Sequence, residues 1–272
     1  FFDVLRAAIL NPVKHYGLNV GLLQPGDPAD LIITSDLENF DVEKTFIDGD
    51  LVYDSGQTRF VIPEEKPVNH FNCQPITVDD IAVPANGDQI RVIIAKDGDL
   101  LTGQEVFPAK IKNGCVVSDI ERDILKIVVV NRYTPSKPVV GFIKNFNFNK
   151  GAIAGSIAHD SHNIIAIGSN DEDLIKAINE IIDFKGGIVA CSGDLKAELK
   201  LDVAGLMSRE EASVVAQKYR DVNNLAKTFG STLSAPFMTM AFMALLVIPD
   251  LKIGDKGLFD VSRFEFTTLF AE

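Results

Sequence analysis

The 272-residue sequence predicts a mixed α/β fold of the α+β type, and three observations point to it. Its second half holds runs of β-branched residues at 91–95, 126–130 and 139–143, which are typical of buried strands. An apolar run at 162–168 precedes a helix-like segment, and another strand-like run follows at 188–191. Strand, helix and strand in this order indicate a βαβ unit. We therefore expect a compact α/β module from residue 89 onward.

The first sixty residues predict one helix and a small β region. Residues 2–10 carry apolar side chains at helical spacing, and we expect Asn11-Pro12 to end the helix because the residue before a proline avoids the helical conformation. Asp48-Gly49-Asp50 separates the last two of four strand-like runs and predicts a β-hairpin, since glycine adopts a positive φ readily. The four runs are residues 20–23, 29–33, 42–47 and 51–53.

Residues 63–88 hold four of the 12 prolines and show little periodicity, so we predict a linker between residues 1–62 and 89–272. Beyond the linker, a helix should begin near Asn170. A second helix should begin at a capping box of Ser208 and Glu211 and end at Gly230. The run 238–246 is apolar on all sides and predicts a fully buried helix.

Composition indicates which partners the chain can bind and in which compartment it is expected. The 26 Lys and Arg against 38 Asp and Glu give a net charge of −12, which argues against binding to nucleic acid or to an anionic membrane. The longest apolar stretch, residues 238–248, is shorter than the about 20 residues that a membrane-spanning helix needs. Cys73, Cys115 and Cys191 form no CxxC pair, so we expect a reducing, cytoplasmic setting.

The residues best suited to chemistry gather in one short segment: His159, Asp160, His162 and Asn163. Two imidazoles and a carboxylate could hold a divalent metal or transfer protons. The two histidines would share a face on a helix, whereas a strand that begins at His162 needs a turn to bring them together. The alternative is a polar turn whose side chains satisfy nearby backbone N–H groups. The residues alone leave both interpretations open.

Other candidates favour a structural interpretation. Gly168-Ser169-Asn170 lacks the glycine pattern of a phosphate-binding loop, so we expect an ordinary strand-to-helix turn with an Asn cap. His15 and His70 are isolated, and we expect structural roles for both. Cys191 has no histidine nearby in the sequence, which argues against a nucleophile.

Two stretches carry a resemblance to known families. Asn11-Pro12, Gly17-Leu18, Pro25-Gly26-Asp27 and Ala29-Asp30-Leu31-Ile32 resemble the passage of the amidohydrolase superfamily from the last barrel helix into a small flanking β-sandwich. The run Ser156-Ile157-Ala158-His159-Asp160-Ser161-His162-Asn163 closely resembles the C-terminal domain of bacterial adenine deaminases. That similarity continues through residues 164–173 and 246–261.

The resemblance implies a division into three parts. Residues 1–62 would be the last barrel helix and a β-sandwich remnant, 63–88 the linker, and 89–272 the α/β C-terminal domain. It also implies that the whole protein hydrolyses adenine to hypoxanthine and ammonia in purine salvage or catabolism. The divalent metal, manganese or iron, would be bound by barrel residues that this chain lacks. We therefore expect a fragment that is inactive alone and requires no metal itself.

The resemblance leaves the role of this part open. In one hypothesis His159, Asp160, His162 and Asn163 complete or cover the active site, by closing it, orienting adenine or binding an auxiliary metal at His159, Asp160 and His162. In the alternative hypothesis the chain is a structural or oligomerisation module, and we expect a homo-oligomer. A third hypothesis, a purine-binding domain that works without the barrel, has least support from the residues.

Overall fold

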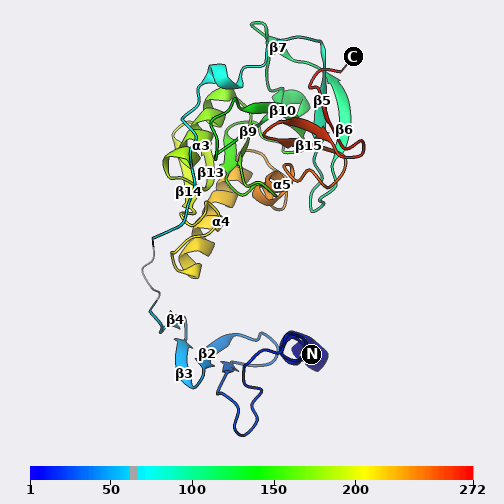
Figure 1. The fold of residues 1–272 in the computed structure, drawn as a ribbon. Coiled ribbons are helices and arrows are strands. Elements are labelled where there is room, and N and C mark those ends of the chain that lie inside the picture. Colours follow the sequence, from blue (N-terminus) through cyan, green and yellow to red (C-terminus); the bar gives the residue numbers. More distant parts are fainter. Residues whose placement is uncertain (62–65, 272) are drawn as a thin grey trace. The chain divides into compact units, whose positions relative to one another are not determined.

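The computed structural model describes residues 1–61 and 66–271, and the chain divides into two compact units, Phe1–Lys66 and Pro67–Glu272. Residues 63–65 of the predicted linker lie outside the described residues, and the part from Pro67 onward belongs to the second unit (Figure 1). Ile76 is buried there, and its backbone N–H and C=O both bond to the side chain of Asn179 at 2.9 Å. Tertiary contacts thus order a segment that has no periodicity of its own.

The first unit begins with a helical stretch that runs past the predicted end. It consists of α1 (Phe2–Leu5), a π-helical turn η1 (Arg6–Leu10) and α2 (Asn11–Tyr16). The prediction that Asn11-Pro12 ends the helix was wrong: the backbone stays helical at Leu10 and Asn11, and Pro12 stands in the first turn of α2, directly after the π-helical turn. Gly17 ends the helix instead, with φ +61°.

A four-stranded antiparallel sheet follows, in the order β1 (Leu31–Thr34), β2 (Val42–Ile47), β3 (Asp50–Asp54) and β4 (Gln57–Thr58). The predicted hairpin is confirmed, with positive φ at Asp48 and Gly49. Residues 20–23 form no strand, because the carboxylates of Asp30 and Asp27 take the backbone N–H groups of Gly21 and Leu22 at 2.8 and 2.9 Å.

This first unit has almost no core of its own. Among its described residues 1–61, only Gly21 is buried. Val42, Ile47, Val52, Tyr53 and Phe60 line a shallow hollow of about 380 Å³ on the sheet. Ile47 is 57% exposed and Phe60 is 56% exposed, so the sheet presents apolar side chains to solvent.

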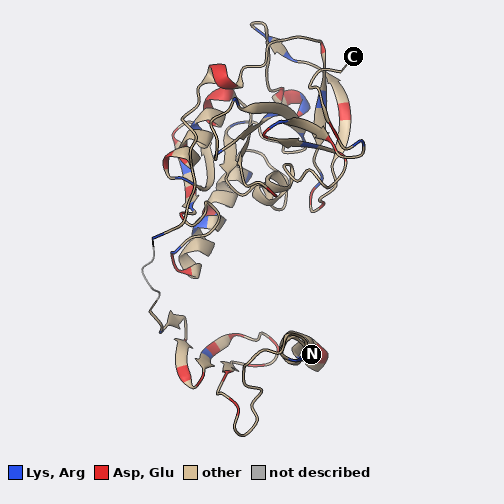
Figure 2. Cartoon of the chain, viewed as in Figure 1, with Lys and Arg blue, Asp and Glu red and all other residues tan. Residues whose placement is uncertain are grey.

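The second unit is built on an eight-stranded mixed sheet, which confirms the mixed α/β class (Figure 1). Its strand order is β14 (Leu195–Lys200), β13 (Gly187–Ser192), β11 (Ala152–Gly155), β12 (Ile164–Gly168), β9 (Ile124–Val130), β10 (Val139–Lys144), β5 (Gln89–Ile94) and β6 (Gly103–Pro108). The central strands are almost free of charged residues (Figure 2).

The predicted βαβ unit is present with one strand inserted. β12 leads into α3 (Asp171–Asp183) and returns as β13, while β11 lies between the two strands and pairs antiparallel with both. Asn170 caps α3 as predicted, accepting the N–H of Asp173 at 2.8 Å. β12 is buried on both faces, which explains its uninterrupted apolar sequence.

Helices cover the two faces of this sheet. α3 and the 3₁₀ turn η2 (Val78–Ile81) pack on one face. The other face is covered by α4 (Ala212–Thr228), α5 (Pro236–Phe242) and the three-stranded sheet of β15 (Leu251–Gly254), β16 (Gly257–Asp260) and β17 (Glu265–Thr267). The remaining elements are β7 (Ile111–Lys112), β8 (Cys115–Val116) and the 3₁₀ turn η3 (Ile120–Arg122).

Two helix predictions need correction. α4 starts at Ala212 rather than at a capping box, because the Oγ of Ser208 accepts the N–H of Glu210 in a local turn at 3.1 Å. The run 238–246 is not a fully buried helix, because α5 ends at Phe242 and Met238 is 52% exposed. None of the helices in the described part has the length and apolar character needed to cross a membrane.

Candidate functional site

The predicted segment lies where two central strands of the large sheet meet. β9 ends at Val130 and β12 begins at Ile164, and these two residues are partners in the antiparallel ladder. Residues 159–163 therefore enter the sheet beside Arg132, which follows β9. We refer to residues 158–163 as the histidine turn. It lies entirely within the second unit.

The histidine turn is closed by its own backbone. The N–H of His162 donates to the carbonyl of Ala158 at 2.6 Å, and His162 has φ +53°. The N–H of His159 donates to the carbonyl of Ala241 in α5 at 3.2 Å. This closed turn brings the two imidazoles together, with their ring centroids 5.4 Å apart.

The four predicted residues have different surroundings. His159 and His162 are half-buried and Asp160 is exposed, so these side chains can reach a ligand. Asn163 is 2% exposed, and its side chain accepts from the N–H of Arg132 and donates to the Oγ of Ser161, both at 3.2 Å. Asn163 therefore holds the turn, as the polar-turn interpretation expects, while the histidines remain free of such bonds.

Several residues of this site were missed by sequence reasoning. Phe242 stacks on His159, with centroids 4.8 Å apart and planes inclined by 20°. The hydroxyl of Tyr133 donates to the carbonyl of Ser161 at 2.8 Å, and the ring of His70 lies edge-on to Tyr133 at 5.9 Å. No local motif marks these residues, and the nearest signal was the position of Arg132-Tyr133 directly after a predicted strand.

The electrostatic surroundings keep His162 in its neutral form. Burial lowers the pKa of His162 below its usual value, and the nearby His159 and Arg132 lower it further. The carboxylate of Asp160 opposes these effects but does not reverse them. The Nδ1 atom of His162 is buried and has no hydrogen-bond partner in the described structure. A neutral imidazole can donate or accept a hydrogen bond toward a ligand.

The histidine turn does not form a metal centre by itself. Across residues 1–61 and 66–271, no three His, Cys, Asp or Glu side chains converge in a way that could hold a metal ion. His159, Asp160 and His162 therefore do not make the three-ligand set that an auxiliary site would need.

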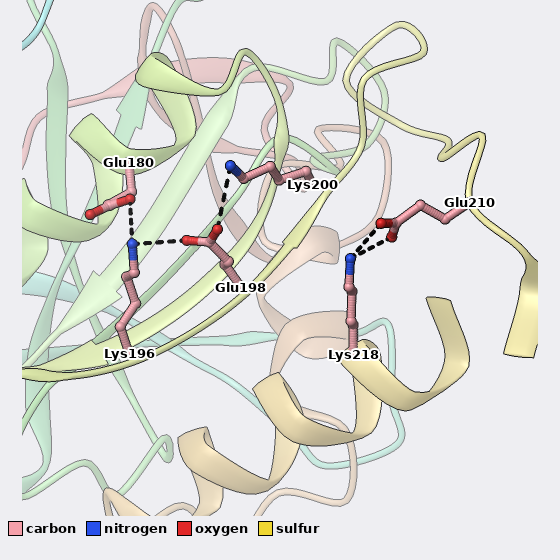
Figure 3. A network of polar contacts seen from close by, with 6 residues as sticks. All are labelled: Glu180, Lys196, Glu198, Lys200, Glu210 and Lys218. Carbon is pink, nitrogen blue, oxygen red and sulfur yellow. Dashed lines mark hydrogen bonds and ion pairs between the residues drawn. The ribbon is translucent and has the colours of Figure 1, made fainter. Parts of the chain in front are cut away.

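The other polar clusters have structural explanations. Ser169 is buried and its Oγ donates to the carbonyl of Gly151 at 3.1 Å, so the turn before α3 is an ordinary strand-to-helix connection. On β14, Lys196 lies 2.9 Å from both Glu180 and Glu198, as Figure 3 shows. Lys200 also pairs with Glu198, at 3.5 Å, so two lysines and two glutamates balance one another in this surface cluster. Burial raises the pKa of the Cys191 thiol to about 12, which excludes a ready nucleophile.

Comparisons with known proteins show the family to which the chain belongs. The family model for the adenine deaminase C-terminal domain matches residues 99–265, and that for the amidohydrolase family matches residues 1–52. Adenine deaminases of Methanosarcina barkeri, Methanosarcina acetivorans and Salinibacter ruber are 52%, 53% and 46% identical over 99–100% of this chain. The chain spans about half the length of these curated relatives, at 50–51%. It belongs to the adenine deaminase C-terminal domain family.

Proposed function

We propose that this chain is the C-terminal part of a metal-dependent adenine deaminase and that it is inactive alone. We call the longer protein, with a preceding half like that of the relatives, the full-length protein. In it the histidine turn completes or covers the site where adenine is hydrolysed to hypoxanthine and ammonia. The names of the relatives and the two family matches support this assignment.

One observation carries the role of the turn. The imidazoles of His159 and His162 make no hydrogen bond in the described structure, although the turn is held by a backbone bond from His159 to α5 and by a bond from the Arg132 N–H to the Asn163 side chain. A histidine that serves only the fold normally uses its ring nitrogens in hydrogen bonds. Two imidazoles held side by side without such partners are suited to a ligand that comes from outside the turn.

The chemistry that we assign to the turn is binding and orientation. Adenine is a neutral heterocycle with hydrogen-bond donors and acceptors along its edge, and a neutral imidazole can pair with either kind of group. The ring of His159, backed by Phe242, offers a flat surface against which a purine can stack. The metal and its bound water belong to residues outside this chain, and we assign no step of their chemistry to the turn.

The proposal is tested by measuring adenine turnover by ultraviolet absorbance, for this chain and for the full-length protein, with Mn²⁺ added to both. We expect hypoxanthine to form only with the full-length protein. Turnover by the chain alone, in a preparation free of contaminating deaminase, would show that the chemistry resides in these 272 residues. Calorimetry with adenine tests the hypothesis of a purine-binding domain that works without the barrel, because that hypothesis requires tight binding of adenine by the chain alone.

A second role is favoured by the first unit. Its sheet exposes Ile47 and Phe60 and buries almost none of its described residues. An apolar sheet face of this kind requires a cover, since exposed apolar surface is unfavourable in water. We propose that the unit packs against the preceding half in the full-length protein and promotes self-association, toward a homo-oligomer, when that half is absent.

A further inference from the structure

Arg132 is a buried cation, 3% exposed. Among the described residues, no carboxylate forms an ion pair with it. Its guanidinium lies between the rings of Phe71 and Tyr133, at 4.8 and 4.7 Å from their centroids. Its Nη2 donates to the Tyr133 hydroxyl at 2.9 Å and to the carbonyl of Ala204 at 2.8 Å. Burial of an unpaired charge is costly, so this arrangement calls for an explanation beyond packing.

The contacts of Arg132 hold the chain on both sides of His162, and we call Arg132 and Tyr133 with these contacts the Arg132 bracket. Its backbone N–H donates to Asn163, the residue after His162. Its side chain donates to the Tyr133 hydroxyl, which in turn donates to the carbonyl of Ser161, the residue before His162. The position of His162 is therefore set from the end of β9, and the positive charge of the bracket lies beside its imidazole.

We propose that Arg132 and Tyr133 are positioning residues for His162, which hold its imidazole at a fixed place toward the substrate. This inference rests on the proposed function of the histidine turn. Burial is the largest cause of the lowered pKa of His162; among the groups that face the imidazole, His159 and Arg132 lower this pKa further and Asp160 raises it. Because Nδ1 is buried and unpartnered, Nε2 is the nitrogen through which His162 meets the purine edge.

The bracket uses both properties of arginine. A positive charge near an imidazole disfavours protonation of that imidazole. A planar guanidinium can stack on aromatic rings and at the same time donate hydrogen bonds, here to the Tyr133 hydroxyl and the Ala204 carbonyl. Lysine would keep the charge and lose the two bonds that Nη2 of Arg132 donates to the Tyr133 hydroxyl and the Ala204 carbonyl. Tyr133→Phe would keep the charge and lose the bond to Ser161. The two contributions can therefore be separated by substitution.

The first test is an NMR titration of the imidazole C2–H signals in this chain, which has four histidines. We expect the measured pKa of His162 to lie below the ordinary histidine value of 6.5. Arg132→Met should raise the measured pKa of His162 toward that value. Arg132→Lys and Tyr133→Phe should leave it near the wild-type value. Arg220→Met, a change at an exposed arginine of α4, is the matched control and should move no histidine.

Each outcome decides the proposal. An unchanged pKa of His162 in a folded Arg132→Met chain would overturn the role of the charge. If that variant does not fold, the wild-type titration still decides, because a pKa for His162 equal to or above the ordinary histidine value of 6.5 contradicts the proposal.

The second test uses the full-length protein and separates this inference from the function on which it rests. We expect Tyr133→Phe to raise KM for adenine several-fold with little change in kcat, and Arg132→Met to shift the acid limb of the pH profile for kcat/KM upward. An unchanged KM in Tyr133→Phe together with an unchanged pH profile in Arg132→Met would overturn the positioning role. If His162→Ala also leaves kcat/KM unchanged, the proposed function itself fails, while the titration result for the chain still stands.

Discussion

Gly205 packs directly against Arg132: a Cβ atom added to Gly205 would lie 2.1 Å from the Nη1 atom of the guanidinium. Gly205 also has φ +70°, and its carbonyl accepts the Oγ–H of buried Ser156 at 2.5 Å. The backbone at Gly205 thus packs closely against the guanidinium of Arg132. A single methyl group at this position has no room.

Gly205→Ala should therefore destabilise the chain more than a glycine substitution that meets only backbone strain. Gly193→Ala is the matched control, because Gly193 also has a positive φ, +56°, but a Cβ there meets nothing within 4 Å. We expect about 1 kcal/mol of destabilisation from strain in both variants and about 1–3 kcal/mol more in Gly205→Ala from the clash. Urea unfolding measures the difference, and equal values for the two variants would contradict the packing described.

Asn163→Ala should also lower the free energy of unfolding. The change removes the acceptor of the buried Arg132 N–H and the donor to Ser161. A buried donor left without a partner costs about 1–3 kcal/mol. Asn86→Ala, at an exposed asparagine of the same unit, should change stability little. A similar loss in both variants would show that Asn163 does not hold the histidine turn.

The lowered pKa of His162 predicts a pH dependence of stability. Below its usual pKa of 6.5, the unfolded chain binds a proton at His162 that the folded chain does not bind. The stability associated with this group is complete above pH 6.5 and is lost as the pH falls toward the folded-state pKa. Between pH 7.5 and 5, wild type should lose more stability than His162→Gln, whereas His15→Gln should follow wild type. If the free energy of unfolding falls by the same amount in all three proteins between pH 7.5 and 5, the prediction is wrong.

The exposed sheet of the first unit predicts self-association. At tens of micromolar, we expect light scattering to show species larger than one chain. Ile47→Lys places a charge on the exposed apolar face and should shift the population toward monomer. Ile111→Lys is the control, because Ile111 is similarly exposed, at 49%, but lies in the second unit. A wild-type chain that is monomeric at these concentrations contradicts the prediction.

The sequence predicted those parts of the fold whose pattern is local. The strands 124–130 and 139–144 and the cap at Asn170 were visible because buried β-branched runs and helix caps depend on neighbouring residues. β11 was missed because Ala152–Gly155 is rich in small residues and becomes a strand only by pairing with both β12 and β13. The start of α4 was misplaced because Ser208 bonds within a tighter turn.

The candidate site shows the same limit. The histidines of the turn could be singled out from residue type and spacing, and the family resemblance pointed to the same run. Arg132 and Tyr133 contact the turn from the segment that follows β9, and Phe242 contacts it from α5, at separations in sequence that no local pattern records. Within the turn, the Asn163 side chain is hydrogen-bonded and the imidazoles make no hydrogen bond to a described residue. This difference depends on those distant partners.

The most direct test of the account is the effect of the turn on catalysis in the full-length protein. kcat/KM for adenine should be measured at saturating Mn²⁺ for wild type, His159→Ala, His162→Ala and the control His15→Ala. We expect each substitution in the turn to lower kcat/KM by about tenfold or more, the loss of one or two substrate hydrogen bonds, while His15→Ala retains the wild-type value. Wild-type kcat/KM in both turn variants would contradict the proposal that the histidine turn serves the active site.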